Sequence, residues 1–243
     1  MTNPLFAPLR LRTGEAWPNR LVLAPLTNQQ SHADGTLSDD ERRWLVRRAA
    51  GGFGAVTTCA AHVSRTGQGF DGQLGLFSDD HRPGLTRLAA EIRAHGAIPL
   101  AQLYHGGVRS PSRLTGVQPI SAVPFHEDKP DFEVPRAATP EELADLVGAF
   151  RDAAIRTVAC GFGGVELHGA HGYLLGQFLS RINDRTDGWG GDIEGRSRLI
   201  REVARAVRAA VPGATVGVRL SPEDIGNARG LDVDETVEVA VRL

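Results

Sequence analysis

Cysteine and lysine are scarce in this sequence. Its 243 residues include two cysteines, Cys59 and Cys160, and both lie inside apolar runs. This argues against a disulfide framework, an iron–sulfur cluster or a four-cysteine zinc site within the chain, and both thiols are expected to be buried. Nearly all basic residues are arginine, and the one lysine, Lys129, lies in a proline-flanked polar loop. Schiff-base chemistry needs a lysine in a dry pocket, so that chemistry is not expected.

Long apolar runs and blocks of like charge are absent as well. The formal net charge is -2 without a cluster of one sign, which argues against nucleic acid or an anionic membrane as a partner. No apolar stretch approaches the length of a membrane span, and the first residues lack the pattern of an export signal. We expect a cytoplasmic protein that acts on a small molecule, with a homo-oligomer as one option for its assembly.

Short apolar runs alternate with longer amphipathic segments along the chain. Strands are predicted at residues 20–27, 54–60, 97–103, 163–168 and 214–221. Among the helices between them, one begins after Ser38 as N-cap, and another begins with a capping box formed by Thr139 and Glu142. A proline-rich loop is predicted at residues 104–138. Strands that alternate with helices predict βα units and a parallel sheet.

A parallel sheet of this kind can stay open or close into a barrel. No G-x-G-x-x-G motif follows a predicted strand, which removes the main support for an open dinucleotide-binding sheet. Thr27, Gln102, His168 and Arg219 are polar residues at strand ends, where barrel active sites are built. The predicted fold is therefore α/β, a (β/α)8 TIM barrel. Five strands are predicted, and the last residues have the pattern of the start of another helix. Residues 1–243 are therefore expected to be the N-terminal portion of a single barrel domain, truncated to its first five or six βα units.

The segment GVELHGAHGYLL concentrates ring-bearing side chains directly after a predicted strand. Alternation places Glu166 and His168 on one face of the strand, and a helical turn would bring His171 beside His168. Tyr173 follows two residues later. These rings can be packing groups at a barrel end, a two-histidine, one-carboxylate metal set with Glu166, or hydrogen-bond donors to a substrate carbonyl accompanied by a phenolic acid.

A longer set of motifs carries a family resemblance. GVELHGAHGYLLGQFLS, followed by NDRTDGWGGDIEGRSR and VGVRLSPED, resembles the Old Yellow Enzyme, or NADH:flavin oxidoreductase, family of FMN-dependent (β/α)8-barrel enzymes. NRLVLAPLTN resembles the first strand of that family, and PLAQLYHGG resembles its third. The resemblance implies FMN as the cofactor and NADH or NADPH as the reductant.

The same resemblance implies which residues lie along the flavin ring. Pro25, Leu26 and Thr27 correspond to residues that lie against the isoalloxazine, with the Thr27 hydroxyl near the C4 oxygen, where a hydrogen bond tunes the redox potential. Ala60, at the end of the second long strand, corresponds to a small residue beside the ring.

Two polar strand residues correspond to contacts with the flavin edge. Gln102 matches the glutamine that reads the pyrimidine edge, where an amide can donate and accept at once. Arg219 matches the arginine beside N1 and the C2 oxygen. A charge on a barrel strand is costly to bury without an anionic partner, so the residues alone already favour a functional role for Arg219.

The activity implied by the resemblance is that of an ene-reductase, which reduces the activated C=C bond of an α,β-unsaturated carbonyl compound. His168 and His171 would hold the carbonyl oxygen, hydride would pass from flavin N5 to Cβ, and Tyr173 would donate a proton to Cα. Two alternatives stay open. One is a metal-dependent barrel lyase or hydrolase that uses Glu166, His168 and His171. The other is an inactive fragment without the later strands on which the FMN phosphate site is expected.

Four positions depart from the family pattern. Asn28 stands where the family often has arginine, and Arg109 lies one residue later than the usual arginine. Arg181 replaces a common proline, and Gly195 replaces a common asparagine. Because none of them is an expected carbonyl donor, these departures should affect loop geometry and substrate choice rather than the class of reaction.

Overall fold

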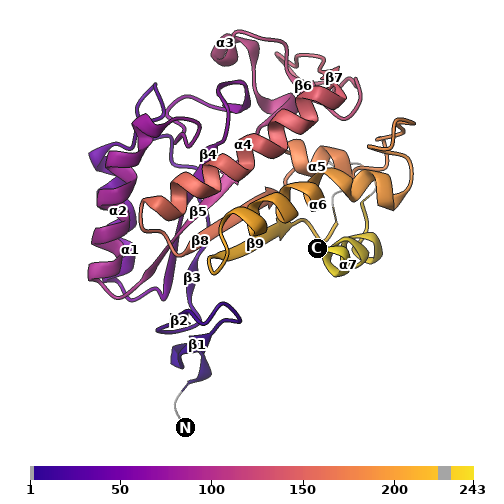
Figure 1. Ribbon diagram of the computed structural model, residues 1–243. Helices are drawn as coiled ribbons and strands as arrows, with labels where there is room; N and C mark the ends of the chain where they lie inside the picture. Colours follow the sequence, from indigo (N-terminus) through magenta and orange to yellow (C-terminus); the bar gives the residue numbers. More distant parts are fainter. Residues whose placement is uncertain (1–2, 224–230) are drawn as a thin grey trace.

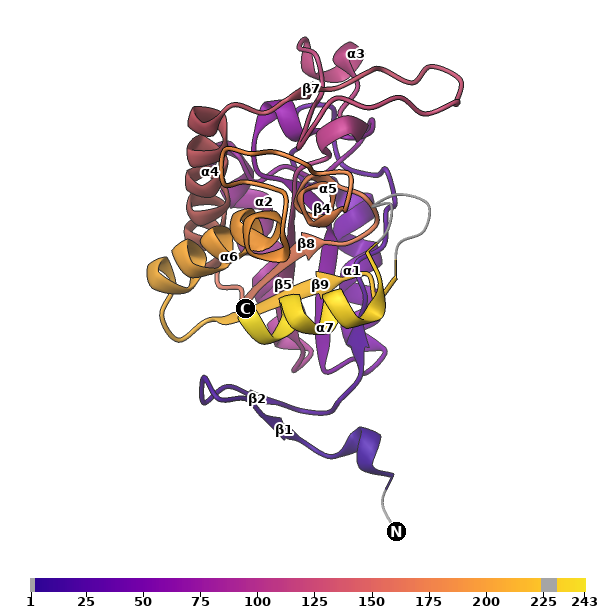
Figure 2. The same ribbon diagram turned by 90° about the vertical axis from the view of Figure 1, so that its right-hand side faces the viewer.

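The centre of the fold is a sheet of five parallel strands. The computed structural model describes residues 3–223 and 231–243, so Asp224, the last residue of the VGVRLSPED motif, lies outside it. The sheet order is β3 (Val22–Leu23), β4 (Ala55–His62), β5 (Ile98–Tyr104), β8 (Gly164–Gly169) and β9 (Thr215–Leu220). This order follows the chain, and the sheet curls into half a barrel (Figures 1 and 2). All five C-terminal strand ends therefore lie at one end of the molecule.

Helices connect the strands and cover the outer face of the curled sheet (Figure 1). The long ones are α1 (Asp39–Ala50), α2 (Arg82–Ala94), α4 (Pro140–Ala159), α6 (Ile193–Ala210) and α7 (Val233–Arg242). The short ones outside the β5–α4 connection are α5 (Leu174–Leu179), η1 (Pro4–Phe6), η2 (Arg65–Gly67) and η3 (Asp79–His81). The predicted α/β architecture of successive βα units is confirmed.

Helix starts follow the predicted capping residues. The Ser38 hydroxyl accepts a hydrogen bond from the backbone N–H of Glu41 at 3.1 Å, at the start of α1. At the start of α4, Thr139 Oγ1 accepts from the Glu142 backbone at 3.3 Å, and Glu142 Oε2 accepts from the Thr139 backbone at 2.9 Å. Each cap satisfies amide groups that the first helical turn leaves without partners, so each fixes where its helix begins.

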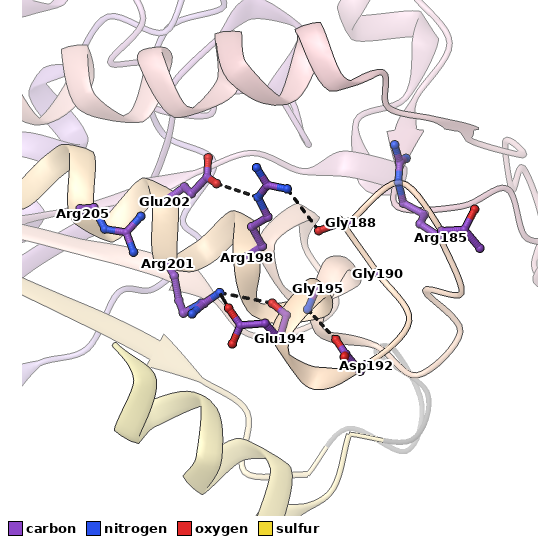
Figure 3. A pocket seen from close by; sticks show the side chains of 11 residues that line it. Arg185, Gly188, Gly190, Asp192, Glu194, Gly195, Arg198, Arg201, Glu202 and Arg205 are labelled. Carbon is purple, nitrogen blue, oxygen red and sulfur yellow. Dashed lines mark hydrogen bonds and ion pairs between the residues drawn. The ribbon is translucent and has the colours of Figure 1, made fainter.

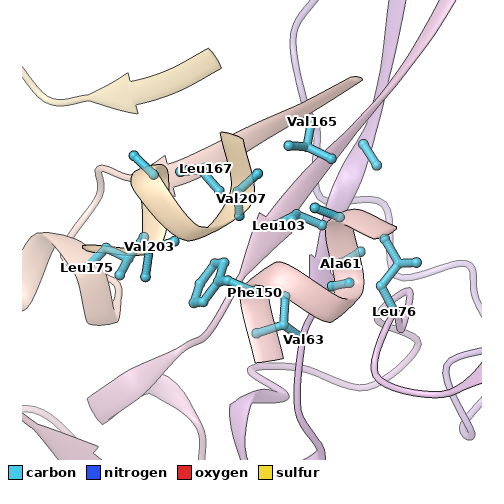
Figure 4. Packing of buried hydrophobic residues seen from close by; sticks show 14 of the residues in the cluster. Ala61, Val63, Leu76, Leu103, Phe150, Val165, Leu167, Leu175, Val203 and Val207 are labelled. Carbon is cyan, nitrogen blue, oxygen red and sulfur yellow. The ribbon is translucent and has the colours of Figure 1, made fainter. Parts of the chain in front are cut away.

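The hydrophobic core lies between these helices and the outer face of the sheet. Figure 4 shows Phe150 of α4 among side chains from β5, β8 and α6. Phe150, Leu103 and Val207 are fully buried, and burial of a side chain of this size stabilises a fold by about 1.5–3 kcal/mol. Strands β4 and β5 are buried along their whole length. Polar residues on the inner face, such as Gln102, are therefore shielded from solvent too.

An N-terminal hairpin packs against the end of the sheet at which the strands begin. Its strands β1 (Leu9–Arg10) and β2 (Ala16–Trp17) pair antiparallel. Trp17 packs in one apolar cluster with Ala55 and Ile98, the first residues of β4 and β5. In Figure 1 the hairpin lies at the opposite end of the molecule from α3. The C-terminal ends of the strands are thereby left for a functional site.

Two sequence predictions about this architecture need correction. The strand predicted at 20–27 is reduced to β3, because Pro25 has no N–H to continue the ladder with β4. The loop predicted at 104–138 contains short elements: η4 (Gly107–Arg109), α3 (Ser112–Thr115), β6 (Ile120–Ser121) and β7 (Arg136–Ala137). Elements of two to four residues are too short to leave a hydrophobic period in the sequence.

Two other predictions concern the cysteines and the membrane. Cys59 and Cys160 are buried free thiols, as predicted. Within residues 3–223 and 231–243, no helix is both long enough and apolar enough to cross a membrane.

Candidate active site

A cavity of about 160 Å³ opens at the C-terminal ends of the strands. Its lining consists of Pro25, Leu26, Thr27, Ala60, Gln102, His168, His171, Tyr173 and Arg219. These are the nine residues for which the sequence predicts catalytic or cofactor-binding roles. The fold thus brings together around one cavity residues that are distributed along most of the chain.

A β-bulge in β4 places Ala60 at this cavity. Thr57 pairs with Leu100, but Ala60 pairs with Gln102, so β4 has one more residue than β5 between the two pairs. Cys59, directly before Ala60, lies with its Sγ 2.9 Å from a carboxylate oxygen of Glu41 in α1. Burial raises the pKa of the Cys59 thiol well above its usual value, which keeps this sulfur protonated and unreactive.

Glu166 joins the two polar strand residues of the cavity. Its carboxylate accepts hydrogen bonds from Gln102 Nε2 at 2.7 Å, from Arg219 Nε at 2.7 Å and from Arg219 Nη2 at 3.2 Å. The anionic partner that Arg219 requires is therefore another side chain of the same sheet. Strand alternation alone places Glu166 on the face of His168, but its contacts depend on the register of β5, β8 and β9, which the sequence does not reveal.

The metal set considered as an alternative is not assembled. Both carboxylate oxygens of Glu166 bond to Arg219, and one of them also bonds to Gln102. A cation at this carboxylate would have to displace a guanidinium. In the part of the chain that the structure describes, no group of three or more His, Cys, Asp or Glu side chains is placed to hold a metal ion. The geometry does not support a metal-dependent lyase or hydrolase.

His168 is held as a neutral imidazole at the end of β8. Its exposed fraction is 4%. Burial, followed by the neighbouring His171 and Arg219, lowers the pKa of His168 from 6.5 to about 3. Nδ1 accepts a long hydrogen bond of 3.4 Å from the backbone N–H of Ala170. A neutral ring that accepts at Nδ1 carries its proton on Nε2, so Nε2 is the atom from which His168 can donate.

His171 stands beside His168 in a left-handed turn. Its φ of 58° is unusual for a residue with a side chain. The backbone N–H of His171 donates to Ser221 Oγ at 3.1 Å, just after β9, which ties the turn to the next strand. The two imidazoles lie edge to face with centroids 5.1 Å apart. The predicted closeness is thus observed, but the predicted helical turn is wrong, because α5 begins only at Leu174.

Tyr173 is the N-cap residue of α5, and its ring packs between two other rings. The centroid of Tyr173 lies 4.9 Å from that of His168 and 4.5 Å from that of Tyr104. The guanidinium carbon of Arg109 lies 5.6 Å from the Tyr173 centroid, within range of a cation–π contact. The sequence shows that Arg109 is displaced from its usual place in the family motif but does not place it at the site. The shift of this arginine by one residue is the only feature of the sequence that points to its role.

The cavity has the features that the polar edge of a flavin requires. Gln102 is 2% exposed and uses Nε2 for Glu166, which leaves its Oε1 as an acceptor. The Arg219 side chain is 34% exposed and brings a positive charge to the same wall. Leu26 is 49% exposed although it is apolar, and it offers a hydrophobic surface beside these polar groups. A few convergent polar groups on an apolar wall are typical of cofactor sites, so the residues present fit a flavin ring.

A larger hollow, of about 530 Å³, lies at the start of α6 (Figure 3). Its charged side chains are largely paired with each other: Arg198 Nε donates to Glu202 at 2.8 Å, and Arg201 pairs with Glu194. The described residues that line it include no histidine, tyrosine or cysteine. This hollow therefore lacks the imidazole and phenol groups that the strand-end cavity collects.

Comparison with known sequences agrees with the motifs. Residues 4–242 match the sequence profile of the NADH:flavin oxidoreductase / NADH oxidase family. The chain is 39% identical over 239 residues to the "Probable NADH-dependent flavin oxidoreductase YqiG" of Bacillus subtilis (strain 168). That similarity covers 96% of this chain and 63% of the relative, so the chain spans less than two thirds of the relative's length.

Comparison with solved structures agrees with the fold. The chain resembles 2-naphthoyl-CoA reductase in complex with 2-naphthoyl-CoA with a TM-score of 0.93 at 30% identity, over 99% of this chain and 38% of the other. It resembles the old yellow enzyme homologue from Zymomonas mobilis with a TM-score of 0.87 at 29% identity, over 98% of this chain and 68% of the other. These neighbours are TIM barrels, so the half-barrel matches a part of that fold and the predicted fold class is confirmed.

Proposed function

The chain belongs to the NADH:flavin oxidoreductase / NADH oxidase family, and from this premise we propose that it forms the flavin and substrate site of an FMN-dependent ene-reductase. The proposed reaction is the NAD(P)H-dependent reduction of the activated C=C bond in an α,β-unsaturated carbonyl compound. The observation that carries the proposal is the convergence of His168, His171 and Tyr173 with Gln102 and Arg219 around one cavity.

FMN fits the wall of the cavity that β3, β4, β5 and β9 provide. The chemistry that it supplies when bound is hydride transfer from NADH or NADPH to the alkene. Gln102 and Arg219 would hold its polar edge. Pro25, Leu26 and Ala60 would contact the ring, and the Thr27 hydroxyl would bond to it. The positive charge of Arg219 would stabilise negative charge on the bound flavin. Because this charge is already fixed in place, the protein would not have to reorganise when electrons arrive.

The two histidines would hold the carbonyl oxygen of the substrate. Negative charge develops on this oxygen while the Cβ atom gains hydride, and a preorganised donor at such a position contributes about 3 kcal/mol. His168 donates from Nε2 and stays neutral at physiological pH, because its pKa is about 3. It therefore polarises the carbonyl without losing a proton to it, and the proton for Cα has to come from another group.

Tyr173 is the group proposed to supply that proton. Its ring lies 4.9 Å from that of His168, so a substrate held by the histidines would also be next to the phenol. Proton donation leaves negative charge on the phenolic oxygen, and the Arg109 guanidinium beside the ring would stabilise that charge. This contact is a reason for Arg109 to be present although it departs from the family pattern.

The test begins with a visible absorption spectrum of the protein supplied with FMN and freed of excess cofactor. A bound flavin spectrum is expected, with bleaching when NADH or NADPH is added under anaerobic conditions and recovery when a cyclic enone is added. The saturated ketone should accumulate in step with recovery. Protein that retains no flavin, or reduced flavin that the enone fails to reoxidise, would contradict the proposal.

A further inference from the structure

Three polar side chains from adjacent strands form one hydrogen-bonded group at the wall of the cavity. Glu166 of β8 lies between Gln102 of β5 and Arg219 of β9 and bonds to both. Gln102 and Arg219 line the cavity, whereas Glu166 is not part of its lining. Any effect of Glu166 on a bound ligand is therefore transmitted through the other two residues or through its charge.

The carboxylate fixes the orientation of the Gln102 amide. A carboxylate can only accept hydrogen bonds, so it must face the NH₂ end of the amide. Nε2 of Gln102 donates to Glu166 Oε1 at 2.7 Å. Rotation of the amide by half a turn would bring two oxygens together, and at 2% exposure of Gln102 little solvent is present to compensate. The amide oxygen is thus turned away from Glu166, where a ligand N–H can meet it.

The same carboxylate fixes the guanidinium of Arg219. Nε and Nη2 bond to the two oxygens of Glu166 at 2.7 and 3.2 Å, which is a bidentate arrangement. This arrangement sets the plane of the guanidinium and leaves Nη1 outside the ion pair. The outcome is a fixed pattern at the cavity wall, with one acceptor from Gln102 and one cationic donor from Arg219.

Glu166 also changes the net charge of this wall. With the carboxylate, the pair formed by Arg219 and Glu166 is neutral; without it, the wall carries one positive charge. Both side chains are partly buried, at 34% and 22% exposure, so solvent screens them only in part. A flavin becomes more negative when it is reduced, so a nearby carboxylate opposes its reduction.

From these contacts we propose that Glu166 is a positioning residue with two effects: it holds Gln102 and Arg219 in the orientation that binds the flavin edge, and its charge lowers the reduction potential of the bound flavin. The proposal rests on the proposed binding of FMN. Its measurable quantities are the affinity for oxidised FMN and the midpoint potential of the FMN-bound protein.

Two substitutions separate the two effects. Glu166→Gln removes the charge at nearly constant shape, and it should raise the ratio of affinities for reduced and oxidised FMN about tenfold, which is a rise in midpoint potential of about 30 mV for a two-electron couple. It should also weaken binding of oxidised FMN several-fold. The new amide at position 166 can present either its oxygen or its NH₂ group to Gln102, so the orientation of Gln102 is no longer fixed. Glu166→Asp keeps the charge but is too short for both partners, so it should weaken FMN binding while the affinity ratio stays within about twofold of wild type.

Glu142→Gln is the matched control. Glu142 also forms a bidentate pair with an arginine, Arg136, but at the start of α4 and outside the cavity. Its loss should leave the midpoint potential unchanged, with circular dichroism used to verify folding of every variant. An unchanged potential in Glu166→Gln, or an equal rise in Glu142→Gln, overturns the proposal. If the wild-type protein binds no FMN, the proposed function and this inference both fail. If the wild-type protein binds FMN and Glu166→Gln has the same midpoint potential, only this inference fails.

Discussion

The rings of His168 and Tyr173 meet edge to face, with centroids 4.9 Å apart and planes inclined at 75°. One ring comes from the end of β8 and the other from the N-cap of α5. The contact brings a neutral N–H donor and a phenolic O–H to the same part of the cavity. Because the two groups have different proposed tasks, removal of each should have a different kinetic effect.

Replacement of Tyr173 by Phe should slow alkene reduction and leave flavin reduction by NAD(P)H intact. The substitution removes the phenolic O–H but keeps the ring that packs on His168 and Tyr104. A positioned general acid contributes about 10²–10⁴-fold, so the alkene half-reaction should lose a factor in that range. Stopped-flow measurement of each half-reaction by itself checks the prediction.

Tyr104→Phe provides the control for that experiment. It removes the same group from the ring that packs on Tyr173, but Tyr104 is not part of the cavity lining. Both half-reactions should stay within a few-fold of wild type. An equal loss in both half-reactions for Tyr173→Phe would refute the role of Tyr173 as proton donor.

Replacement of His168 by Leu should also slow the alkene half-reaction, by about 100-fold. This factor corresponds to the loss of one preorganised donor worth about 3 kcal/mol. His168→Asn retains an N–H donor of shorter reach, so it should recover part of the rate. Single-turnover kinetics with a cyclic enone would measure both variants. Wild-type rates in His168→Leu would exclude the ring as a carbonyl donor.

Stability should fall as the pH drops from 6.5 to 5. Burial lowers the pKa of His62 to about 4 and the pKa values of His105 and His168 to about 3, all from 6.5. Below pH 6.5 these three side chains take up protons in the unfolded chain but stay neutral in the folded protein. Each of them therefore lowers the free energy of unfolding by about 1.4 kcal/mol for each unit by which the pH falls. Urea titrations at several pH values measure this slope.

A histidine substitution identifies the source of that pH dependence. His105→Gln should reduce the slope by about 1.4 kcal/mol per pH unit. His126→Gln, which changes an exposed histidine, should leave the slope as it is in wild type. The same slope in His105→Gln and wild type would show that His105 does not contribute.

Two glycine-to-alanine substitutions should change stability in opposite directions. An added Cβ at Gly164 would lie 2.0 Å from the Thr215 carbonyl oxygen on the neighbouring strand, so backbone must move, at a cost of about 1–3 kcal/mol. At Gly148, inside α4, the nearest atom is an Arg151 nitrogen at 3.9 Å. Alanine there should gain about 0.5–1 kcal/mol. Urea unfolding of both variants checks the signs, and stabilisation by Gly164→Ala would contradict the close approach of β8 and β9.

Much of the fold is predictable because its long elements leave periodic signals. Apolar runs predict the strands around Ala55, Ile98, Gly164 and Thr215, and the capping box of Thr139 predicts the start of α4. The short elements between β5 and α4 leave no such period. The early end of β3 depends on Pro25 and on pairing along one edge only, which an apolar run does not reveal.

The candidate site also has some features that the sequence predicts and others that it does not. The sequence identified the nine residues of the lining through strand ends and family motifs, and these residues surround one cavity. The contact of Glu166 with Gln102 and Arg219 depends on register across three strands. The φ of 58° at His171 depends on the tie to Ser221, which is distant in sequence. Such features arise from tertiary packing and leave no local pattern.

The bulge in β4 decides which atom the chain presents next to the proposed substrate. With regular pairing of β4 and β5, Cys59 rather than Ala60 would be opposite Gln102. A thiol in that position would meet electron-poor alkenes, which alkylate sulfur by conjugate addition. The inserted residue replaces this nucleophile with a methyl group and turns the sulfur toward Glu41. If the proposed ene-reductase activity holds, this single added residue protects the site from alkylation by its own substrates.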